Sequence, residues 1–270
     1  QFLIAAIRAE ASSGSGPAVP TPKPAPAPAA GPKPAPFVAA SSHGKIQVNR
    51  LSSMRRAISK KMNQAKPGVP HFSYVEEVDV TDLEAMRREM NAKADGGEKL
   101  SILPFIMRAL ILSVPEAPYV NALYNGDRQE VHIYDEIRLG IAVATDKGLM
   151  VPVIGNAQKK DVYEAAAAIR HVAEAARDGT ASRDELVGST MTLTSLGALG
   201  GIASTPVLNP PEVAIIGVNK VRTAPVWNGE AFEPRQLMNL SCSFDHRIID
   251  GQAAAKFVAA MKRRIEACEI

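Results

Sequence analysis

The chain has 270 residues, of which 46% are hydrophobic and 22% are charged, and its formal net charge is +3. This composition is ordinary for a globular protein, and so small a charge argues against a nucleic-acid partner. No apolar run reaches the roughly 20 residues that a membrane-spanning helix needs, so we expect no membrane association. The two cysteines, Cys242 and Cys268, have neither metal-ligand nor disulfide spacing. We therefore expect no metal site and a reducing compartment.

The first residues differ in composition from the rest of the chain. Residues 1–11 read as the remnant of a preceding domain, and the initial Gln suggests a fragment or processed form of a longer protein. Residues 12–44 alternate proline with alanine and lysine, a pattern that favours extended polyproline II and cannot build a core. We predict a flexible Pro/Ala-rich linker there, which could reach on the order of 90 Å. It would serve as a plain spacer, an SH3-type ligand or a tether between a mobile module and a fixed core.

Dense hydrophobic patterning begins at residue 45 and predicts one domain over residues 45–270. Thr81 and Glu84 have the spacing of a capping box that opens a helix. Strands and helices mix without strict alternation, which predicts an α/β fold with a two-layer mixed β-sheet and helices on one face. Periodicity and turn residues predict further helices over residues 51–64, 100–114, 162–177 and 252–266, and strands over 71–80, 137–144, 149–154, 190–195, 213–218 and 237–244.

The segment most suggestive of chemistry is residues 243–251, where the last predicted strand turns into the last helix. It places His246 four residues ahead of Asp250 and Gly251. Histidine can take and return a proton near neutral pH, and a nearby acid can orient it, so the pattern fits activation of a weak nucleophile. A histidine with a purely structural role at a strand end is the alternative. A Cys242–His246 catalytic pair is a further alternative, but four residues of strand cover roughly 13 Å, so we expect Cys242 to be a small residue on a strand face.

Several segments together resemble one known family. The sequence His-Arg-Ile-Ile-Asp-Gly at 246–251 resembles the active-site motif of the dihydrolipoamide acyltransferases, the cores of the 2-oxo acid dehydrogenase complexes. Chloramphenicol acetyltransferase shares that motif and fold, so the resemblance implies a chloramphenicol acetyltransferase-like, trimeric protein. Residues 54–62, 148–154, 190–201 and 209–214 match other family segments in order. Residues 71–81 and 99–105 look most like the branched-chain type, with the acetyl type as runner-up.

The resemblance implies thioester exchange between acyl-dihydrolipoamide and coenzyme A. His246 would be the general base for the thiol of coenzyme A, since the thiolate is the nucleophile. A hydroxyl would stabilise the tetrahedral oxyanion; Thr194 matches the family position, and the adjacent Ser195 is the fallback. Asp250 is also a helix N-cap candidate, so we expect it to orient the loop and not to transfer a proton. Gly251 would allow close packing or a special dihedral angle.

Coenzyme A carries phosphates, so basic residues should bind it. The resemblance places a coenzyme A contact near Arg87 or Arg88, and helical spacing puts Arg87 on the side of the apolar residues. A solvated helix charge is the alternative for Arg87, and Arg55 and Arg56 are ambiguous in the same way. Ser101, in the segment that resembles the branched-chain type, and Gly251 complete the predicted coenzyme A contacts.

The family also implies an assembly and partners. Its cores are trimers with the active site between subunits, and trimers join into larger cubic or dodecahedral cores; the end of this chain lacks the apolar tail used for that step. The lipoyl group would sit on a domain absent from this chain, and absent domains would also bind the decarboxylase and dihydrolipoamide dehydrogenase components. We expect a bacterial cytoplasmic protein, or a mitochondrial matrix protein if the source is eukaryotic. An antibiotic acetyltransferase and a non-catalytic scaffold are the competing interpretations.

Overall fold

The computed structural model describes residues 49–94 and 99–270, with a compact unit over Arg50–Ile270. The predicted remnant at 1–11 and the predicted linker at 12–44 lie outside the described residues, so both stay predictions. Within the compact unit, buried hydrophobic side chains from the sheet and its covering helices form one large core and one small cluster.

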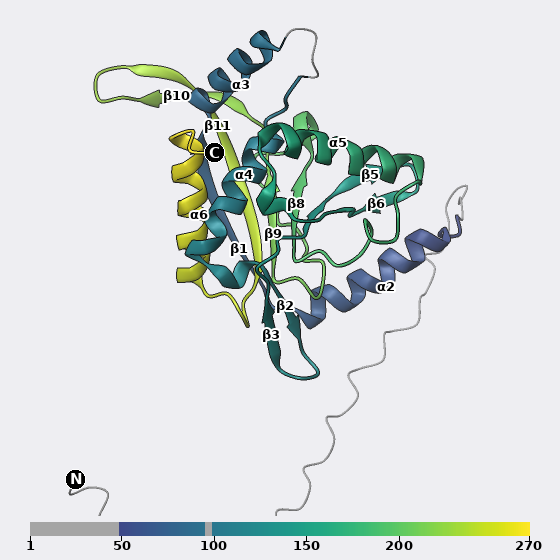
Figure 1. The fold of residues 1–270 in the computed structure, drawn as a ribbon. Coiled ribbons are helices and arrows are strands. Elements are labelled where there is room, and N and C mark those ends of the chain that lie inside the picture. Colours follow the sequence, from purple (N-terminus) through teal and green to yellow (C-terminus); the bar gives the residue numbers. More distant parts are fainter. Residues whose placement is uncertain (1–48, 95–98) are drawn as a thin grey trace, which may run out of the picture. The chain divides into compact units, whose positions relative to one another are not determined.

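A seven-stranded mixed sheet is the centre of this unit (Figure 1). Its strand order is β1-β11-β9-β8-β4-β7, and β10 pairs with β11 beyond this path. The pairs β4–β8 and β8–β9 are parallel and the other pairs are antiparallel. The sheet strands are β1 (His71–Asp79), β4 (Leu139–Ile141), β7 (Val153–Ile154), β8 (Met191–Ser195), β9 (Ala214–Val218), β10 (Arg222–Trp227) and β11 (Phe232–Asp245). Two separate hairpins are formed by β2 (Ala122–Asn125) with β3 (Glu130–Ile133) and by β5 (Val143–Thr145) with β6 (Gly148–Met150).

Helix α4 contacts both α5 and α6, and the three helices cover one face of the sheet (Figure 1). The expected fold class, a mixed sheet with helices on one face, is therefore confirmed, whereas the trimer stays a prediction. The α-helices are α2 (Ser53–Gly68), α3 (Thr81–Lys93), α4 (Leu103–Ser113), α5 (Val162–Asp178) and α6 (Gly251–Glu266). Short 3-10 turns are η1 (Val114–Glu116), η2 (Pro118–Val120), η3 (Ala157–Lys159) and η4 (Gly197–Leu199).

The last helix, α6, shows how the sequence pattern becomes packing. Asp250 is its N-cap, and the carboxylate accepts a hydrogen bond from the backbone N–H of Ala253. The apolar residues at helical spacing in α6 are all buried, as predicted. Among them, Phe257 packs edge to face against Phe244 of β11, with ring centroids 6.4 Å apart. Since β11 leads directly into the Asp250 turn, this contact fixes α6 relative to the strand that carries the predicted histidine.

Two predicted helix boundaries and one predicted helix cap are wrong. The first helix runs on through Pro67 to Gly68 and does not end before them, and α4 begins at Leu103, later than expected. The Thr81 capping box does not form: the Thr81 hydroxyl donates to Asp79 Oδ1 and accepts from the backbone N–H of Gln236 on β11. A contact distant in sequence therefore replaces the local cap.

The strand pattern also differs from the prediction in particular places. The expected strands at 137–144 and 149–154 each break in two, so that β4 and β7 join the main sheet while β5 and β6 form their own hairpin. The β2–β3 hairpin and β10 were not predicted, and β11 begins earlier than expected. The unpredicted β2–β3 hairpin lies beside the histidine loop, and this placement matters for the site.

Candidate active site

His246 lies immediately after the last residue of β11, at the surface. Its backbone N–H donates to the carbonyl of Pro70 at 3.0 Å, and its ring lies against Phe72 with centroids 4.8 Å apart. Phe72 pairs with Phe244 in the β1–β11 ladder, so the contact comes from the sheet itself. The imidazole is therefore supported on one side and open to a substrate or a second subunit on the other.

Cys242 is not part of this site, in agreement with the prediction. It is fully buried within β11, where it pairs with Tyr74 and Ile216 of the flanking strands. Burial raises the pKa of its thiol to about 12, so the thiolate is essentially absent near neutral pH. Cys242 packs as a small apolar side chain.

Asp250 and Gly251 occupy the start of α6, in the turn that follows His246. The Asp250 carboxylate accepts from Ala253 N–H at 2.8 Å, and in the described part of the chain no hydrogen bond joins Asp250 to His246. The N-cap interpretation of Asp250 is thus confirmed. The special dihedral angle expected for Gly251 is wrong, because its φ is not positive. The close packing expected as the alternative is not seen within the described residues, because an added Cβ would meet only Phe72, at 3.9 Å.

Thr194 and Ser195 end strand β8 just before the glycine-rich turn. The Ser195 hydroxyl accepts a hydrogen bond from the backbone N–H of Gly197 at 3.1 Å, which ties it to the turn. Among the described residues the Thr194 hydroxyl has no such partner, and the side chain is partly exposed. Both hydroxyls keep their O–H proton available for a ligand, but only the Ser195 hydroxyl is held by the turn.

Within one subunit the structure does not bring Thr194 and His246 together. Thr194 pairs with Gly217 of β9, and Gly217 pairs with Ser241 of β11. His246 lies five residues further along β11. At about 3.3 Å per residue and about 4.8 Å per strand spacing, the separation is roughly 19 Å. A hydroxyl and a histidine this far apart cannot act on one carbonyl within the subunit.

Arg87 and Ser101 lie together, at the other end of β1 from His246. Arg87 donates to both carboxylate oxygens of Glu84 (2.7 and 3.0 Å) and to the carbonyl of Leu100, which precedes Ser101. The hydrogen bonds to Glu84 raise the pKa of the half-buried guanidinium. Arg87 is on the packed side of α3, as predicted, and Arg88 is exposed. These contacts give Arg87 a structural role that the sequence did not reveal.

Ser101 lines a pocket of about 240 Å³ between the start of α4 and helix α5. The pocket also contains three cationic side chains, Lys99, Arg170 and Arg177. Three positive charges beside a hydroxyl suit a phosphate-bearing ligand. The coenzyme A contact of Ser101 stays a prediction, and Arg170 and Arg177 were not predicted as part of a site.

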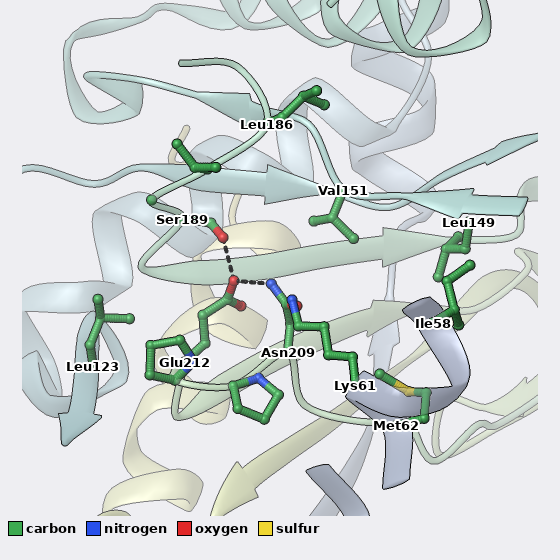
Figure 2. A pocket seen from close by; sticks show the side chains of 14 residues that line it. Ile58, Lys61, Met62, Leu123, Leu149, Val151, Leu186, Ser189, Asn209 and Glu212 are labelled. Atoms are coloured by element: carbon green, nitrogen blue, oxygen red, sulfur yellow. Dashed lines mark hydrogen bonds between the residues drawn. The ribbon is translucent and has the colours of Figure 1, made fainter. Parts of the chain in front are cut away.

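A larger pocket, of about 510 Å³, lies between α2 and the strands near the His246 end of the sheet (Figure 2). Its polar floor is Glu212, which is 2% exposed and accepts hydrogen bonds from Ser189, Thr192 and Asn209. Burial raises the pKa of the Glu212 carboxyl although these donors oppose the shift. The rest of the lining is mostly apolar, with Ile58, Met62, Leu123, Leu149, Val151 and Leu186 among its members. Glu212 was predicted only as part of a family segment, and its burial was not predicted.

Residues 49–94 and 99–270 contain neither a metal-binding cluster nor a membrane-spanning helix. No group of three or more His, Cys, Asp or Glu residues there is arranged to hold a metal ion. No helix in those ranges is both long enough and apolar enough to cross a membrane.

The mixed sheet, its one-sided helices and the histidine turn place the chain in a known class. Residues 43–270 match the family described as 2-oxoacid dehydrogenases acyltransferase (catalytic domain), and the chain belongs to this family. The family expected from the motifs is thereby confirmed, as is the assignment of the domain as an acyltransferase.

The individual relatives of this chain are components of two kinds of dehydrogenase complex. The chain is 50% identical over 214 residues to the lipoamide acyltransferase component of the branched-chain alpha-keto acid dehydrogenase complex of Pseudomonas aeruginosa, covering 79% of this chain and 50% of the relative. It is 37% identical over 227 residues to the dihydrolipoyllysine-residue acetyltransferase component of the pyruvate dehydrogenase complex of Haemophilus influenzae, covering 83% and 40%. The chain thus spans about half the length, or less, of these curated relatives.

Solved structures agree with the fold. The dihydrolipoamide acetyltransferase of Azotobacter vinelandii superposes with a TM-score of 0.83 at 35% identity, covering 88% of this chain and 98% of that one. That structure belongs to an investigation of the roles of one serine, one histidine and one asparagine in the catalytic mechanism. The cubic core of a pyruvate dehydrogenase multienzyme complex matches equally well, with a TM-score of 0.83 at 36% identity.

Proposed function

We propose that this chain transfers a branched-chain acyl group between dihydrolipoamide and coenzyme A as the core of a 2-oxo acid dehydrogenase complex. The observation that carries the acyl type is the 50% identity to a branched-chain component, against 37% to an acetyl-transferring one. The acetyl type is the second candidate because those relatives match over a similar length. We also propose that the protein is bacterial and cytoplasmic, because the relatives named above are bacterial.

In the proposed reaction His246 removes the proton from the thiol of coenzyme A. The thiolate attacks the acyl-dihydrolipoamide carbonyl, and the Thr194 hydroxyl donates a hydrogen bond to the oxyanion of the tetrahedral intermediate. When the intermediate collapses, the carbon–sulfur bond to dihydrolipoamide breaks and the leaving sulfur receives the proton from His246. The products are acyl-coenzyme A and dihydrolipoamide, so protons and electrons balance without an oxidant or a metal.

The roles of Thr194, His246 and Asp250 gain support from the Azotobacter enzyme. Its investigated serine and histidine are separated in sequence by the same interval as Thr194 and His246. Its histidine and asparagine have the same interval as His246 and Asp250. Threonine keeps the hydroxyl of serine, and aspartate keeps the N-capping oxygen of asparagine, so the chemistry tolerates both differences.

The distance of roughly 19 Å between Thr194 and His246, estimated from strand geometry, supports an active site shared between subunits. We propose a trimer in which each interface joins His246 of one subunit to Thr194 of the next, as closed symmetry would allow. Coenzyme A would extend toward the cationic pocket at Ser101 and toward Arg87. A larger cubic core, the lipoyl group, the decarboxylase and the dihydrolipoamide dehydrogenase are proposed on the same family basis.

The test is acyl transfer from isobutyryl-, acetyl- and succinyl-coenzyme A to free dihydrolipoamide. We expect the highest kcat/KM with isobutyryl-coenzyme A, and we expect His246→Ala to reduce the rate by about 10²-fold or more with the oligomer intact. His171→Ala is the matched control, since His171 is also exposed but pairs with Glu185 on another face. A preference for acetyl-coenzyme A would favour the second candidate. No transfer from any of the three would support a scaffold.

A further inference from the structure

The loop that carries His246 is held by an ion pair formed by its two neighbours in sequence. Asp245 is 2% exposed, and Arg247 donates to both of its carboxylate oxygens, at 2.9 Å from Nε and 2.6 Å from Nη2. Asp245 Oδ1 also accepts the backbone N–H of Arg247. A bidentate pair of this kind fixes geometry as well as charge. His246 therefore lies between two residues that are locked to each other.

The guanidinium of Arg247 rests on an aromatic ring from a different element. Its central carbon lies 4.5 Å from the ring centroid of Tyr124, on strand β2. This is within the distance for a cation–π interaction, which holds an arginine in place without using its hydrogen-bond donors. With its central carbon over the Tyr124 ring, Arg247 still donates from Nε and Nη2 to Asp245.

Tyr124 is itself anchored near the start of β9. Its backbone N–H donates to the carbonyl of Pro211, and its neighbour Leu123 forms a β-bridge with Glu212. The backbone N–H of Asp245 donates to the carbonyl of Val213, two residues after Pro211. The same short segment thus supports both the hairpin below Arg247 and the strand end that leads to His246.

Apart from its backbone hydrogen bond, His246 is supported in the described structure mainly by Phe72 and by the contacts of Arg247 with Asp245 and Tyr124. No carboxylate hydrogen-bonds to the imidazole within the described residues, because Asp250 caps α6 and Asp245 pairs with Arg247. The orientation of the ring must then follow from the backbone of the turn. Residues locked on both sides of a catalytic group define that backbone more tightly than a single contact would.

We propose that Arg247 is a positioning residue for His246, and that Tyr124 is the platform that holds Arg247. This inference rests on the proposed function, since it assumes that His246 acts as the base. Arg247 acts through the turn and not on the substrate. Its loss should lower kcat while leaving the affinity for both substrates nearly unchanged.

The experiment compares Arg247→Met, Arg247→Lys, Tyr124→Phe and Tyr124→Leu in the acyl-transfer assay. Because small displacements of a catalytic group are costly, we expect Arg247→Met to lower kcat about 10²-fold. Lysine keeps the charge but not the bidentate geometry, so Arg247→Lys should recover part of the loss. Tyr124→Phe keeps the ring and should stay within about threefold of wild type, whereas Tyr124→Leu should lose about three- to tenfold.

Two readouts separate positioning from a general loss of structure. KM for coenzyme A and dihydrolipoamide should change by less than about threefold, and the pH profile should keep its shape while the plateau falls. Arg263→Met is the matched control, because Arg263 also pairs with a carboxylate, Glu116, but at the exposed end of α6. If Arg247→Met does not fold because it leaves Asp245 buried and unpaired, the double variant D245N/R247M removes that charge.

Each outcome decides one question. A folded Arg247→Met or double variant with wild-type kcat would overturn the positioning role, and so would a loss confined to KM. Equal losses for Tyr124→Phe and Tyr124→Leu would assign the role to the tyrosine hydroxyl and refute the platform. If wild type shows no acyl transfer, the proposed function fails instead. A crystal structure of the variant then still tests whether the His246 ring moves.

Discussion

Replacing Asp250 tests whether the acid of the histidine motif organises the helix or takes part in the chemistry. The structure shows its carboxylate accepting from Ala253 N–H at the N-terminus of α6, with no hydrogen bond to His246 in the described residues. Asp250→Ala removes this cap, which costs about 1 kcal/mol. Asp250→Asn keeps the capping oxygen and loses only the charge at the helix N-terminus, worth about 0.3–1 kcal/mol at low salt.

For a domain of this size, 1 kcal/mol corresponds to a shift of about 2–4 °C in Tm. We expect Asp250→Ala to melt that much lower than Asp250→Asn, at one fixed protein concentration because the proposed trimer would link stability to concentration. Acyl transfer should follow the cap, so that Asp250→Asn keeps most of the activity and Asp250→Ala loses more. Equal melting temperatures would refute the capping argument. A stable Asp250→Asn that loses more than about tenfold in kcat would show that the charge itself acts in the chemistry.

Two further predictions follow from the same geometry. If each site joins His246 of one subunit to Thr194 of the next, random co-assembly of inactive His246→Ala and Thr194→Ala subunits should restore about a quarter of wild-type activity. No recovery of activity in verified mixed oligomers would place both groups in one subunit. As a control, the Ser195→Ala variant should be active without any co-assembly. Burial raises the pKa of Glu212 above its ordinary value of 4.5, so its contribution to stability is present below pH 4.5 and is lost as pH rises through the folded-state pKa. Urea midpoints should then show wild type losing stability relative to Glu212→Gln as pH rises from about 4.5, and a pH-independent difference would contradict this.

Much of the fold was predictable because its strongest signals are local. The spacing of apolar residues in α6 and the alternation in β1 identified both elements within a residue or two. Strand β10 was missed because Pro225 lies inside it, opposite Pro234 of β11, and proline argues against a strand except at an edge. The Thr81 cap failed because its hydroxyl is used by Asp79 and by the distant Gln236, which no local pattern reveals.

The candidate site was predictable only in part, for a related reason. His246, Asp250 and Thr194 were predicted as separate residues, but their spacing in the sequence does not show which side chains lie close together. The platform beneath Arg247 comes from the unpredicted β2–β3 hairpin, whose Tyr124 lies more than a hundred positions earlier in the chain. Residues that act through tertiary contacts leave no spacing signal.

The predicted catalytic and binding residues do not form one complete active site within a single chain. Arg87 and Ser101 lie beyond the Asp79 end of β1, and His246 lies beyond the other end, about 26 Å away along a nine-residue strand. In the proposed reaction His246 acts on the thiol of coenzyme A and Thr194 acts on the oxyanion, so both side chains must reach one thioester. The trimer proposed above would meet this requirement without moving any strand, by placing the Thr194 turn of one subunit against the exposed His246 of its neighbour. In that trimer the proposed positioning of His246 through Arg247 and Tyr124 would matter more, since the base would have to meet a hydroxyl that its own chain does not position.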